Sequence, residues 1–182
     1  MNIKLETKRL ILREVLSTDV DKLFELDNNP NVQKYVGNKP VKDKSEVEKL
    51  IQLLQKQYTE NGIARWAVID KNTNELIGWS GIKLIKEPIN NHNNFYELGY
   101  RFIEKYWGKG LATETTIALA DFAFENLKTE SIYAICDVEN KGSKNVLEKT
   151  GLKLIETFNH EGKEHNWFRI TKSEWENKNL NN

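Results

Sequence analysis

The sequence has few of the residues that mark specialised protein classes. Cys136 is its only cysteine, so an internal disulfide is impossible and we expect a reducing, cytoplasmic location. Its three histidines, His92, His160 and His165, lack the spacing of metal ligands. Met1–Lys8 lacks the apolar core of a signal peptide, and no run approaches the roughly 18 apolar residues of a membrane span. We therefore expect no metal site and no membrane anchor.

The chain also has no excess of either charge. Lysine and arginine total 27, aspartate and glutamate total 27, and the net charge is +0. Binders of DNA or RNA usually carry a basic excess, because neutralised phosphates supply much of their affinity, so no nucleic-acid partner is expected. A chain of 182 residues suits one domain that buries roughly 70% of its unfolded surface. We expect a single domain at 1–176 and a polar tail at 177–182.

Apolar spacing predicts a strand and two helices in the first third of the chain. Lys8–Glu14 is apolar in its middle and predicts a strand. Thr18-x-x-Asp21 resembles a capping box that opens an amphipathic helix. Asp43-x-x-Glu46 caps a second helix. The apolar face of that helix is formed by Val47, Leu50, Ile51, Leu54 and Tyr58.

The remainder of the chain alternates strands with helices. Ala64–Asp70 and Glu75–Ile85 predict an antiparallel hairpin. Gly78 and Gly81 in its second strand indicate a bulge or a close backbone approach. Phe95–Ile103 predicts a further strand. After it come a helix from Gly110 to about Leu127, a strand at Ser131–Val138, a helix at Lys141–Lys149 and two strands about a turn at His160–Lys163.

A glycine-containing turn joins the strand Phe95–Ile103 to the long helix. Gly108 and Gly110 permit positive φ and have no Cβ to block an approaching anion. The start of the helix adds unpaired N–H groups and about half a positive charge, and Lys109 adds a cation. The turn is suited to a diphosphate, although a plain connection is the alternative. A dinucleotide fingerprint is not met, because Thr113 replaces its third glycine, and no P-loop run exists.

The turn resembles the pyrophosphate loop of the GNAT acetyltransferases. The family pattern R/Q-x-x-G-x-G/A is met except that Lys105 fills its first place. Three more segments are similar to the RimJ/RimL-type branch, which acetylates ribosomal-protein N-termini, as in the ribosomal-protein-alanine N-acetyltransferases, and other amines. These are Thr7–Arg13 (TKRLILR), Glu97–Tyr100 (ELGY) and Asn140–Gly151 (N-x-x-S-x-x-V-L-E-K-x-G).

The resemblance implies a GNAT fold of the α/β (α+β) class, as a monomer or homodimer. The fold would have a mixed, mostly antiparallel sheet of six to seven strands, flanked by helices and splayed between its fourth and fifth strands. Those strands would be Phe95–Ile103 and Ser131–Val138, and the pantetheine arm of acetyl-CoA would enter between them. The helix after Gly110 would be the right-handed crossover.

The resemblance also implies the residues that bind acetyl-CoA. Main-chain amides near the end of the splayed strand would hold the pantetheine and polarise the thioester carbonyl, and one such donor is typically worth ~10²–10³ in rate. The implied cofactor-binding residues are Phe102, Ile103, Trp107, Gly108, Lys109, Gly110, Leu111, Ala112, Thr113, Asn140 and Ser143.

Two side chains are candidates for acid and base. Many GNAT enzymes carry a tyrosine acid where Leu147 stands here, and in the RimJ/RimL branch a serine at the place of Ser143 is proposed to protonate the thiolate. The alternative for Asn140 and Ser143 is a helix N-cap with a first-turn serine. Glu97 is the candidate base, acting directly or through water; the alternative is an ion pair with Arg101 on the same strand face.

These residues predict an acetyl-CoA-dependent N-acetyltransferase whose acceptor is a primary amine. A peptide α-amine, with a pKa near ~7.7–8.0, is partly neutral at physiological pH, whereas a lysine near ~10.4 is about 0.1% neutral. We therefore favour a protein N-terminus over a polyamine or an aminoglycoside. A polycation would want converging carboxylates, for which Glu46, Glu48, Glu60 and Glu97 are available. A non-catalytic acyl-CoA-binding module is the other alternative.

Overall fold

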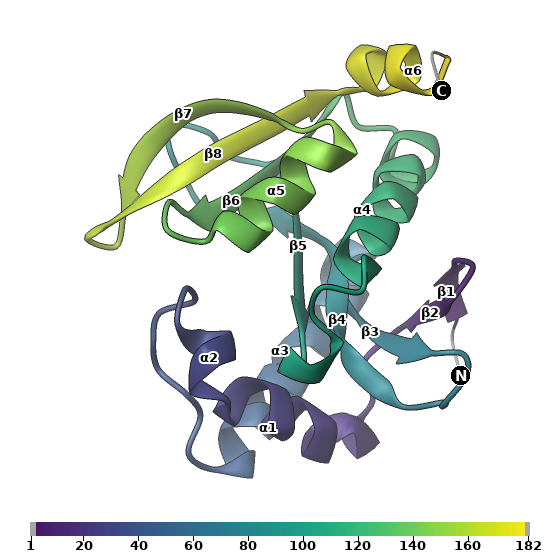
Figure 1. The fold of residues 1–182 in the computed structure, drawn as a ribbon, viewed down its shortest axis with the longest axis vertical. Helices are drawn as coiled ribbons and strands as arrows, with labels where there is room; N and C mark the ends of the chain where they lie inside the picture. Colours follow the sequence, from purple (N-terminus) through teal and green to yellow (C-terminus); the bar gives the residue numbers. More distant parts are fainter. Residues whose placement is uncertain (1–2, 181–182) are drawn as a thin grey trace.

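The computed structural model describes residues 3–180 and contains an eight-stranded sheet (Figure 1). The strand order is β1-β2-β3-β4-β5-β6-β8-β7. Every neighbouring pair is antiparallel except β5 and β6, which confirms the mixed, mostly antiparallel sheet. The strands are β1 Ile3–Glu6, β2 Leu10–Arg13, β3 Arg65–Asp70, β4 Leu76–Ile85, β5 Phe95–Phe102, β6 Ser131–Asp137, β7 Lys153–His160 and β8 Lys163–Thr171.

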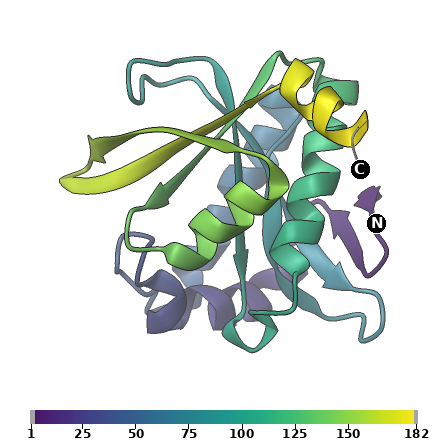
Figure 2. The same ribbon diagram turned by 45° about the horizontal axis from the view of Figure 1, so that its top comes forward.

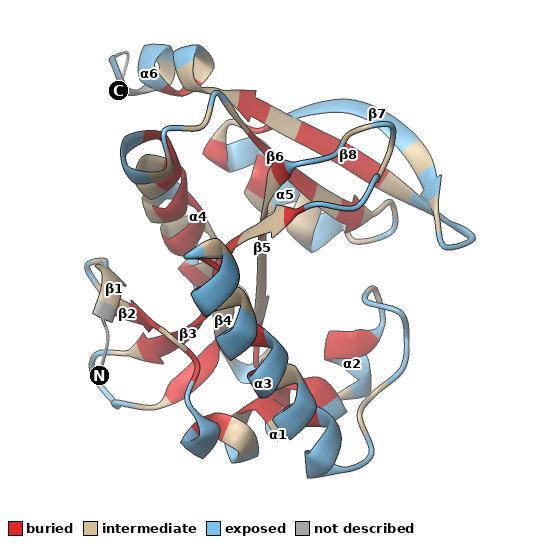
Figure 3. Cartoon of the chain, turned by 180° about the vertical axis from the view of Figure 1, so that it is seen from behind, coloured by how far each residue is buried: buried red, intermediate tan, exposed pale blue. Residues whose placement is uncertain are grey.

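Helices cover both faces of the sheet. In the view from behind, α3 lies in front of the sheet with α1 beside it, whereas α4 and α5 lie on the opposite face (Figures 2 and 3). Two apolar clusters fill these interfaces, one beneath α1 and α3 and the other beneath α4 and α5. The helices are α1 Val20–Asn28, α2 Pro30–Gln33, α3 Lys44–Asn61, α4 Leu111–Phe122, α5 Lys141–Thr150 and α6 Lys172–Leu180, with a π-helical turn at Ala123–Leu127 after α4.

The capping box predicted for α3 is confirmed, whereas the one predicted for α1 is wrong. Asp43 accepts from the Ser45 N–H over 2.8 Å and its own N–H donates to Glu46 over 3.2 Å. At α1 the chain turns first through a 3₁₀ turn at Ser17–Asp19, which places Thr18 inside the turn. Asp19 accepts there from the Leu16 N–H over 2.8 Å.

The predicted splay lies between β5 and β6. The two parallel strands are paired only at Glu97 and Tyr133, although they continue to Phe102 and Asp137. In the chain these are the fifth and sixth strands, because β1 was not predicted and moves the count by one. The sheet therefore opens at the carboxyl ends of β5 and β6, next to the turn that precedes α4.

Helix α6 was also not predicted. Thr171 and Glu174 form a capping box at its start: the Thr171 N–H donates to Glu174 over 2.9 Å and the Glu174 N–H donates to Thr171 over 3.2 Å. Trp175 is buried against the core and donates to Asp121 over 2.8 Å. The helix includes residues 177–180 of the expected polar tail, and 181–182 lie outside the described residues.

Residues 3–180 contain neither a membrane-crossing helix nor a cluster of metal ligands. No helix in this part of the chain is long and apolar enough to cross a membrane. In the same residues, no three His, Cys, Asp or Glu side chains are grouped so that they could hold a metal ion.

Candidate active site

A cavity of about 530 Å³ lies where β5 and β6 diverge. Its walls come from α2, the end of β5, the turn before α4 and the start of α5. Every predicted cofactor-binding residue lines it except Ile103. The glycine turn and the start of the Asn140–Gly151 motif, which lie about 30 residues apart in sequence, thus meet at one opening in the sheet.

The glycine turn presents main-chain amides to this cavity. Gly108 and Gly110 have φ of +72° and +74°, in the left-handed region, where other residues are strained. Within residues 3–180, no protein acceptor pairs with the N–H groups of residues 108–113. Such a row of amides, ending in the first turn of α4, suits the diphosphate of coenzyme A.

An N-terminal arginine fixes the position of this turn. Glu114, in the first turn of α4, accepts from the Arg9 side chain over 2.6 Å and from the Arg9 main-chain N–H over 2.9 Å. Thr7 donates to the same carboxylate over 2.6 Å, and Arg9 also donates to the Lys109 carbonyl over 2.9 Å. Burial alone raises the pKa of Glu114, but the hydrogen bonds from Thr7 and Arg9 together lower it.

The end of β5 faces the cavity with one amide. The Ile103 N–H donates to Ile77 in β4 over 3.0 Å and its side chain is buried, so this amide is already engaged. The Phe102 carbonyl accepts from the Trp107 indole over 2.7 Å. Successive peptide groups of a strand alternate in direction, so the Phe102 N–H points away from β4, toward the gap. Of the two predicted amides, only the Phe102 N–H is free to meet a ligand.

The start of α5 forms the opposite wall. Asn140 is the N-cap and accepts from the Ser143 N–H over 3.0 Å, which confirms the capping interpretation. Both residues also line the cavity, so capping leaves Asn140 in reach of a ligand. The Ser143 hydroxyl lies 3.0 Å from the Tyr100 hydroxyl of β5. Leu147, at the position of the tyrosine in many relatives, is buried in the core.

Glu97 pairs with Arg65, so the predicted alternative pair with Arg101 is wrong. The Arg65 guanidinium donates to Oε2 of Glu97 over 2.6 Å, and the carboxylate side chain is only 18% exposed. Arg101 is ion-paired with the buried Asp27 of α1 instead. Four residues along a strand span roughly 13 Å, so Glu97 and Arg101 are too far apart to pair. Glu97 does not line the cavity.

The motif around Glu97 has a physical explanation in the sheet. Arg65, Gly81 and Gly99 lie opposite one another on β3, β4 and β5. A Cβ at Gly99 would lie 2.8 Å from Nη2 of Arg65, so only glycine leaves room for the guanidinium. The Arg65 side chain therefore reaches across β4 to Glu97. The glycines predicted to allow a close backbone approach include Gly81, whose Cβ would lie 2.8 Å from the Arg65 Cα.

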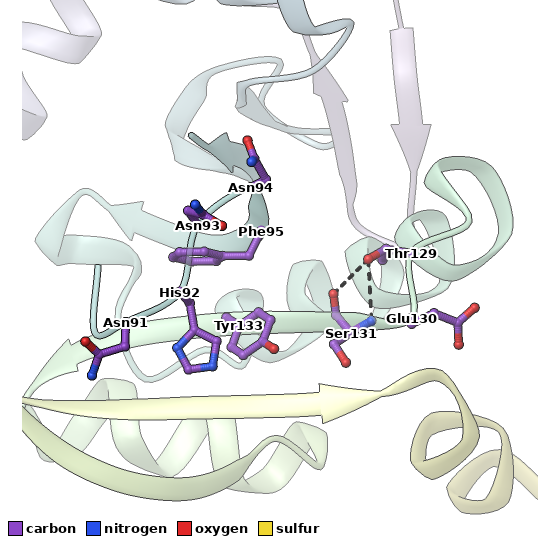
Figure 4. Close-up of a pocket in the computed structure, with 9 residues that line it drawn as sticks. All are labelled: Asn91, His92, Asn93, Asn94, Phe95, Thr129, Glu130, Ser131 and Tyr133. Carbon is purple, nitrogen blue, oxygen red and sulfur yellow. Dashed lines mark hydrogen bonds between the residues drawn. The ribbon is translucent and has the colours of Figure 1, made fainter. Parts of the chain in front are cut away.

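A second cavity, of about 420 Å³, lies beside the first residues of β5 and β6 (Figure 4). The imidazole of His92 and the ring of Tyr133 form part of its wall, with ring centres 5.4 Å apart. Thr129 donates to the Ser131 carbonyl over 2.9 Å at its other end. None of the predicted site residues lines this cavity, so it is separate from the site at the splay.

Sequence reasoning missed several residues that hold the site together. Arg65 and Asp27 were not singled out, because their partners lie on other elements of the fold. Arg9 belonged to a recognised motif but had no assigned contact. Tyr100 was recognised only as part of the Glu97–Tyr100 motif, which gives no sign of a contact between its hydroxyl and Ser143.

Comparisons with known proteins agree with this geometry. A family model described as an acetyltransferase (GNAT) domain matches residues 9–153. The uncharacterized N-acetyltransferase p20 of Bacillus licheniformis is 34% identical over 139 residues, which cover 76% of this chain and 76% of that protein. The spermidine N(1)-acetyltransferase of Vibrio cholerae is 29% identical over 154 residues, which cover 82% of this chain and 84% of that protein.

A solved structure gives the same result. The GNAT-family acetyltransferase from Bacillus anthracis has a TM-score of 0.76 at 26% identity, and the match covers 95% of this chain and 99% of that one. Motifs, sheet, cavity and relatives therefore agree. The chain belongs to the GNAT family and is an acetyl-CoA-dependent N-acetyltransferase.

Proposed function

We propose that the enzyme acetylates the α-amine of a peptide or protein N-terminus, in the manner of the RimJ/RimL branch. The observation that carries this choice is the ion pair between Glu97 and Arg65. The guanidinium occupies Oε2, so one carboxylate oxygen is left to accept a proton, and Glu97 does not line the cavity itself. An α-amine near pKa ~8 needs only a modest acceptor, whereas an amine near ~10.4 needs a strong one.

Acetyl-CoA supplies the acetyl group as an activated thioester. The amides of residues 108–113 hold the diphosphate, and the side chain of Asn140 contacts the pantetheine arm. The Phe102 N–H donates to the thioester carbonyl as negative charge develops on its oxygen. Ser143 donates a proton to the sulfur as the carbon–sulfur bond breaks.

Glu97 takes up the proton that the amine loses on forming its bond to carbon. Arg65 donates to Oε2, and no partner is found for Oε1 within the described residues. A water molecule on Oε1 carries the proton from the amine, because Glu97 does not line the cavity itself. The carboxylate thus acts through water, as one of the two routes expected from the sequence.

A polyamine acceptor is the second candidate, because a spermidine acetyltransferase is among the relatives. The carboxylates suggested for such a substrate do not support it. Glu46 and Glu60 are at opposite ends of α3, roughly 21 Å apart along its axis. Glu46 accepts from the Asp43 N–H, and Glu60 is paired with Lys56.

The proposal is tested by release of free coenzyme A from acetyl-CoA. The acceptors are peptides that differ in the first residue, spermidine and an aminoglycoside, each at pH 7.5. We expect the highest kcat/KM for a peptide with a free N-terminus and none for the same peptide with a blocked one. Higher kcat/KM with spermidine would overturn the acceptor class. Tight binding of acetyl-CoA without turnover of any amine would favour a non-catalytic module.

A further inference from the structure

A hydroxyl pair bridges the opening of the sheet. The Tyr100 hydroxyl, from β5, lies 3.0 Å from the Ser143 hydroxyl and 3.2 Å from the Ser143 carbonyl, at the start of α5. Both residues line the same cavity. The contact joins the two walls at a place where β5 and β6 no longer pair.

The ring of Tyr100 is held by the core, whereas its hydroxyl reaches the cavity. Leu98 and Phe102, on the same strand face, are buried and fix the direction of that face. Burial raises the pKa of the Tyr100 phenol above its ordinary value, although the hydrogen bond to Ser143 acts the other way. The phenol therefore keeps its proton at neutral and mildly alkaline pH.

Ser143 needs a partner in order to act as an acid. An aliphatic hydroxyl that gives its proton to sulfur becomes an alkoxide, which is unfavourable unless another donor supplies a proton at once. Leu147, one helical turn later, is apolar and buried and offers none. A phenol is a stronger acid than an alcohol, and Tyr100 brings one within hydrogen-bond distance of Ser143.

We propose that Tyr100 is the proton source behind Ser143 and positions its hydroxyl for the leaving thiolate. This inference rests on the proposed function of the site. The amine nitrogen bonds to the acetyl carbon, and the carbon–sulfur electron pair moves to sulfur. Sulfur takes the Ser143 proton as Ser143 takes the Tyr100 proton. Glu97 takes up the proton lost by the amine and releases it to solvent, and a proton from solvent restores Tyr100, so no proton is gained or lost overall.

The geometry allows this transfer because Tyr100 has one hydrogen and two acceptors. When the phenol donates to the Ser143 carbonyl, its oxygen can accept from the Ser143 hydroxyl. When it turns to donate to the Ser143 oxygen, the Ser143 hydrogen is free to point into the cavity. A negative sulfur in the cavity favours the second arrangement.

Cys136 is the other titratable neighbour of Ser143. It lies on β6 and contacts Ser143 and Asn166, and burial raises the pKa of its thiol. Cys136 does not line the cavity, whereas Tyr100 does, so Tyr100 is the neighbour placed to pass a proton to Ser143 there. Further charged or titratable groups lining the cavity are Arg101, Lys109, Lys149, Tyr35 and Tyr106.

The first test is a double-mutant cycle on turnover. Tyr100→Phe keeps the ring and removes only the hydroxyl, and Tyr96→Phe is the matched control on the same face of β5. We expect Tyr100→Phe to lower kcat by about ten- to hundredfold with the KM for acetyl-CoA unchanged, and Tyr96→Phe and Cys136→Ala to leave kcat unchanged. The double variant with Ser143→Ala should be no slower than Ser143→Ala alone. Additive losses, or a change in KM only, would overturn the proposal.

The second test needs no acceptor amine. Coenzyme A and desulfo-coenzyme A are titrated by calorimetry at pH 7 and pH 9.5, on either side of a thiol pKa near ~8.5. We expect the affinity for coenzyme A, relative to the desulfo analogue, to rise about tenfold between the two pH values in the wild type. This rise should be smaller in Tyr100→Phe than in the wild type; the cavity cations Arg101, Lys109 and Lys149 are present in both proteins, so they do not account for the difference.

The two tests separate this inference from the proposed function. An equal rise in Tyr100→Phe and wild type would exclude Tyr100 as the proton source behind Ser143, whatever the acceptor is. A normal pH effect on binding, together with no turnover of any amine, would instead remove the proposed acceptor and leave the hydroxyl pair in place as a thiolate-binding device.

Discussion

The guanidinium of Arg9 donates to Glu114 over 2.6 Å and to the carbonyl of Lys109 over 2.9 Å. The two contacts connect the turn before β2 to a loop that is 100 residues away in sequence. Gly108 and Gly110 have no side chains that could restrain the main chain of the turn before α4. The hydrogen bonds from Arg9 restrain it instead, from the N-terminal hairpin.

The first prediction concerns this contact. Arg9→Ala and Glu114→Gln should each raise the Kd for coenzyme A by about tenfold, because the amides lose their preorganised direction. Calorimetric titration measures the effect. Lys4→Ala, which breaks a surface pair with Glu14 on the same hairpin, is the control and should leave Kd unchanged. Equal affinity in all three variants would contradict the role of Arg9.

The second prediction separates backbone strain from ligand binding. Gly110 and Gly62 have similar φ, +74° and +71°, and a Cβ has no contact within 3.5 Å at either. Alanine at either position should cost about 1–2 kcal/mol in unfolding free energy, measured by urea denaturation. Only Gly110→Ala should also weaken binding of coenzyme A. If Gly62→Ala weakened it equally, the loop assignment would fail.

The third prediction addresses the base. Glu97→Gln cannot take up a proton, so kcat/KM for a peptide α-amine at pH 7 should fall by about tenfold or more. The deficit should shrink as pH rises through ~8, where the amine is already neutral. A pH–rate profile with Glu48→Gln as control measures this. A deficit that is constant with pH would show that Glu97 has a structural role only.

The fourth prediction concerns the pH dependence of stability at α6. The hydrogen bond from Lys153, followed by the one from the Thr171 amide, lowers the pKa of Glu174 from 4.5 to about 2. Because the folded pKa is the lower one, this contribution is complete above pH 4.5 and is lost as pH falls toward 2. Wild type and Glu174→Gln should therefore differ in unfolding free energy at pH 6, and the difference should shrink below pH 4.5 and disappear only below about pH 2. Glu176→Gln should show no such convergence.

Local signals in the sequence predicted most of the fold. Helix α3 carries its capping box and apolar face within its own residues, and the hairpin β3–β4 consists of two largely apolar runs on either side of a polar turn. Strand β1 was missed although Ile3–Glu6 (IKLE) alternates apolar and charged residues, because four residues are the shortest run in which such alternation indicates a strand. Helix α6 was missed although Thr171-x-x-Glu174 is a capping box, because among its described side chains Trp175 alone is buried.

The candidate site was also predicted only in part: residues that are contiguous in sequence were found, whereas contacts between distant residues were not. The glycine turn is contiguous in sequence, so its residues were found together and line one cavity. The partners of Glu97 and Ser143 were not found, because Arg65 and Tyr100 reach them across strands or across the opening. Register between strands decides such contacts, and a single sequence does not encode register in a readable form.

The single pair of residues that joins β5 to β6 has a mechanical consequence. Strands β1–β5 and β6–β8 are two parts of the sheet that are joined by one pair of residues, and beyond that pair the facing main-chain groups of β5 and β6 are not hydrogen-bonded to each other. The pantetheine arm of acetyl-CoA is extended and has amide groups, so it can hydrogen-bond to these main-chain groups. Each turnover would then stiffen the protein when acetyl-CoA enters and loosen it when coenzyme A departs, so hydrogen exchange along β5 and β6 would report the catalytic cycle itself.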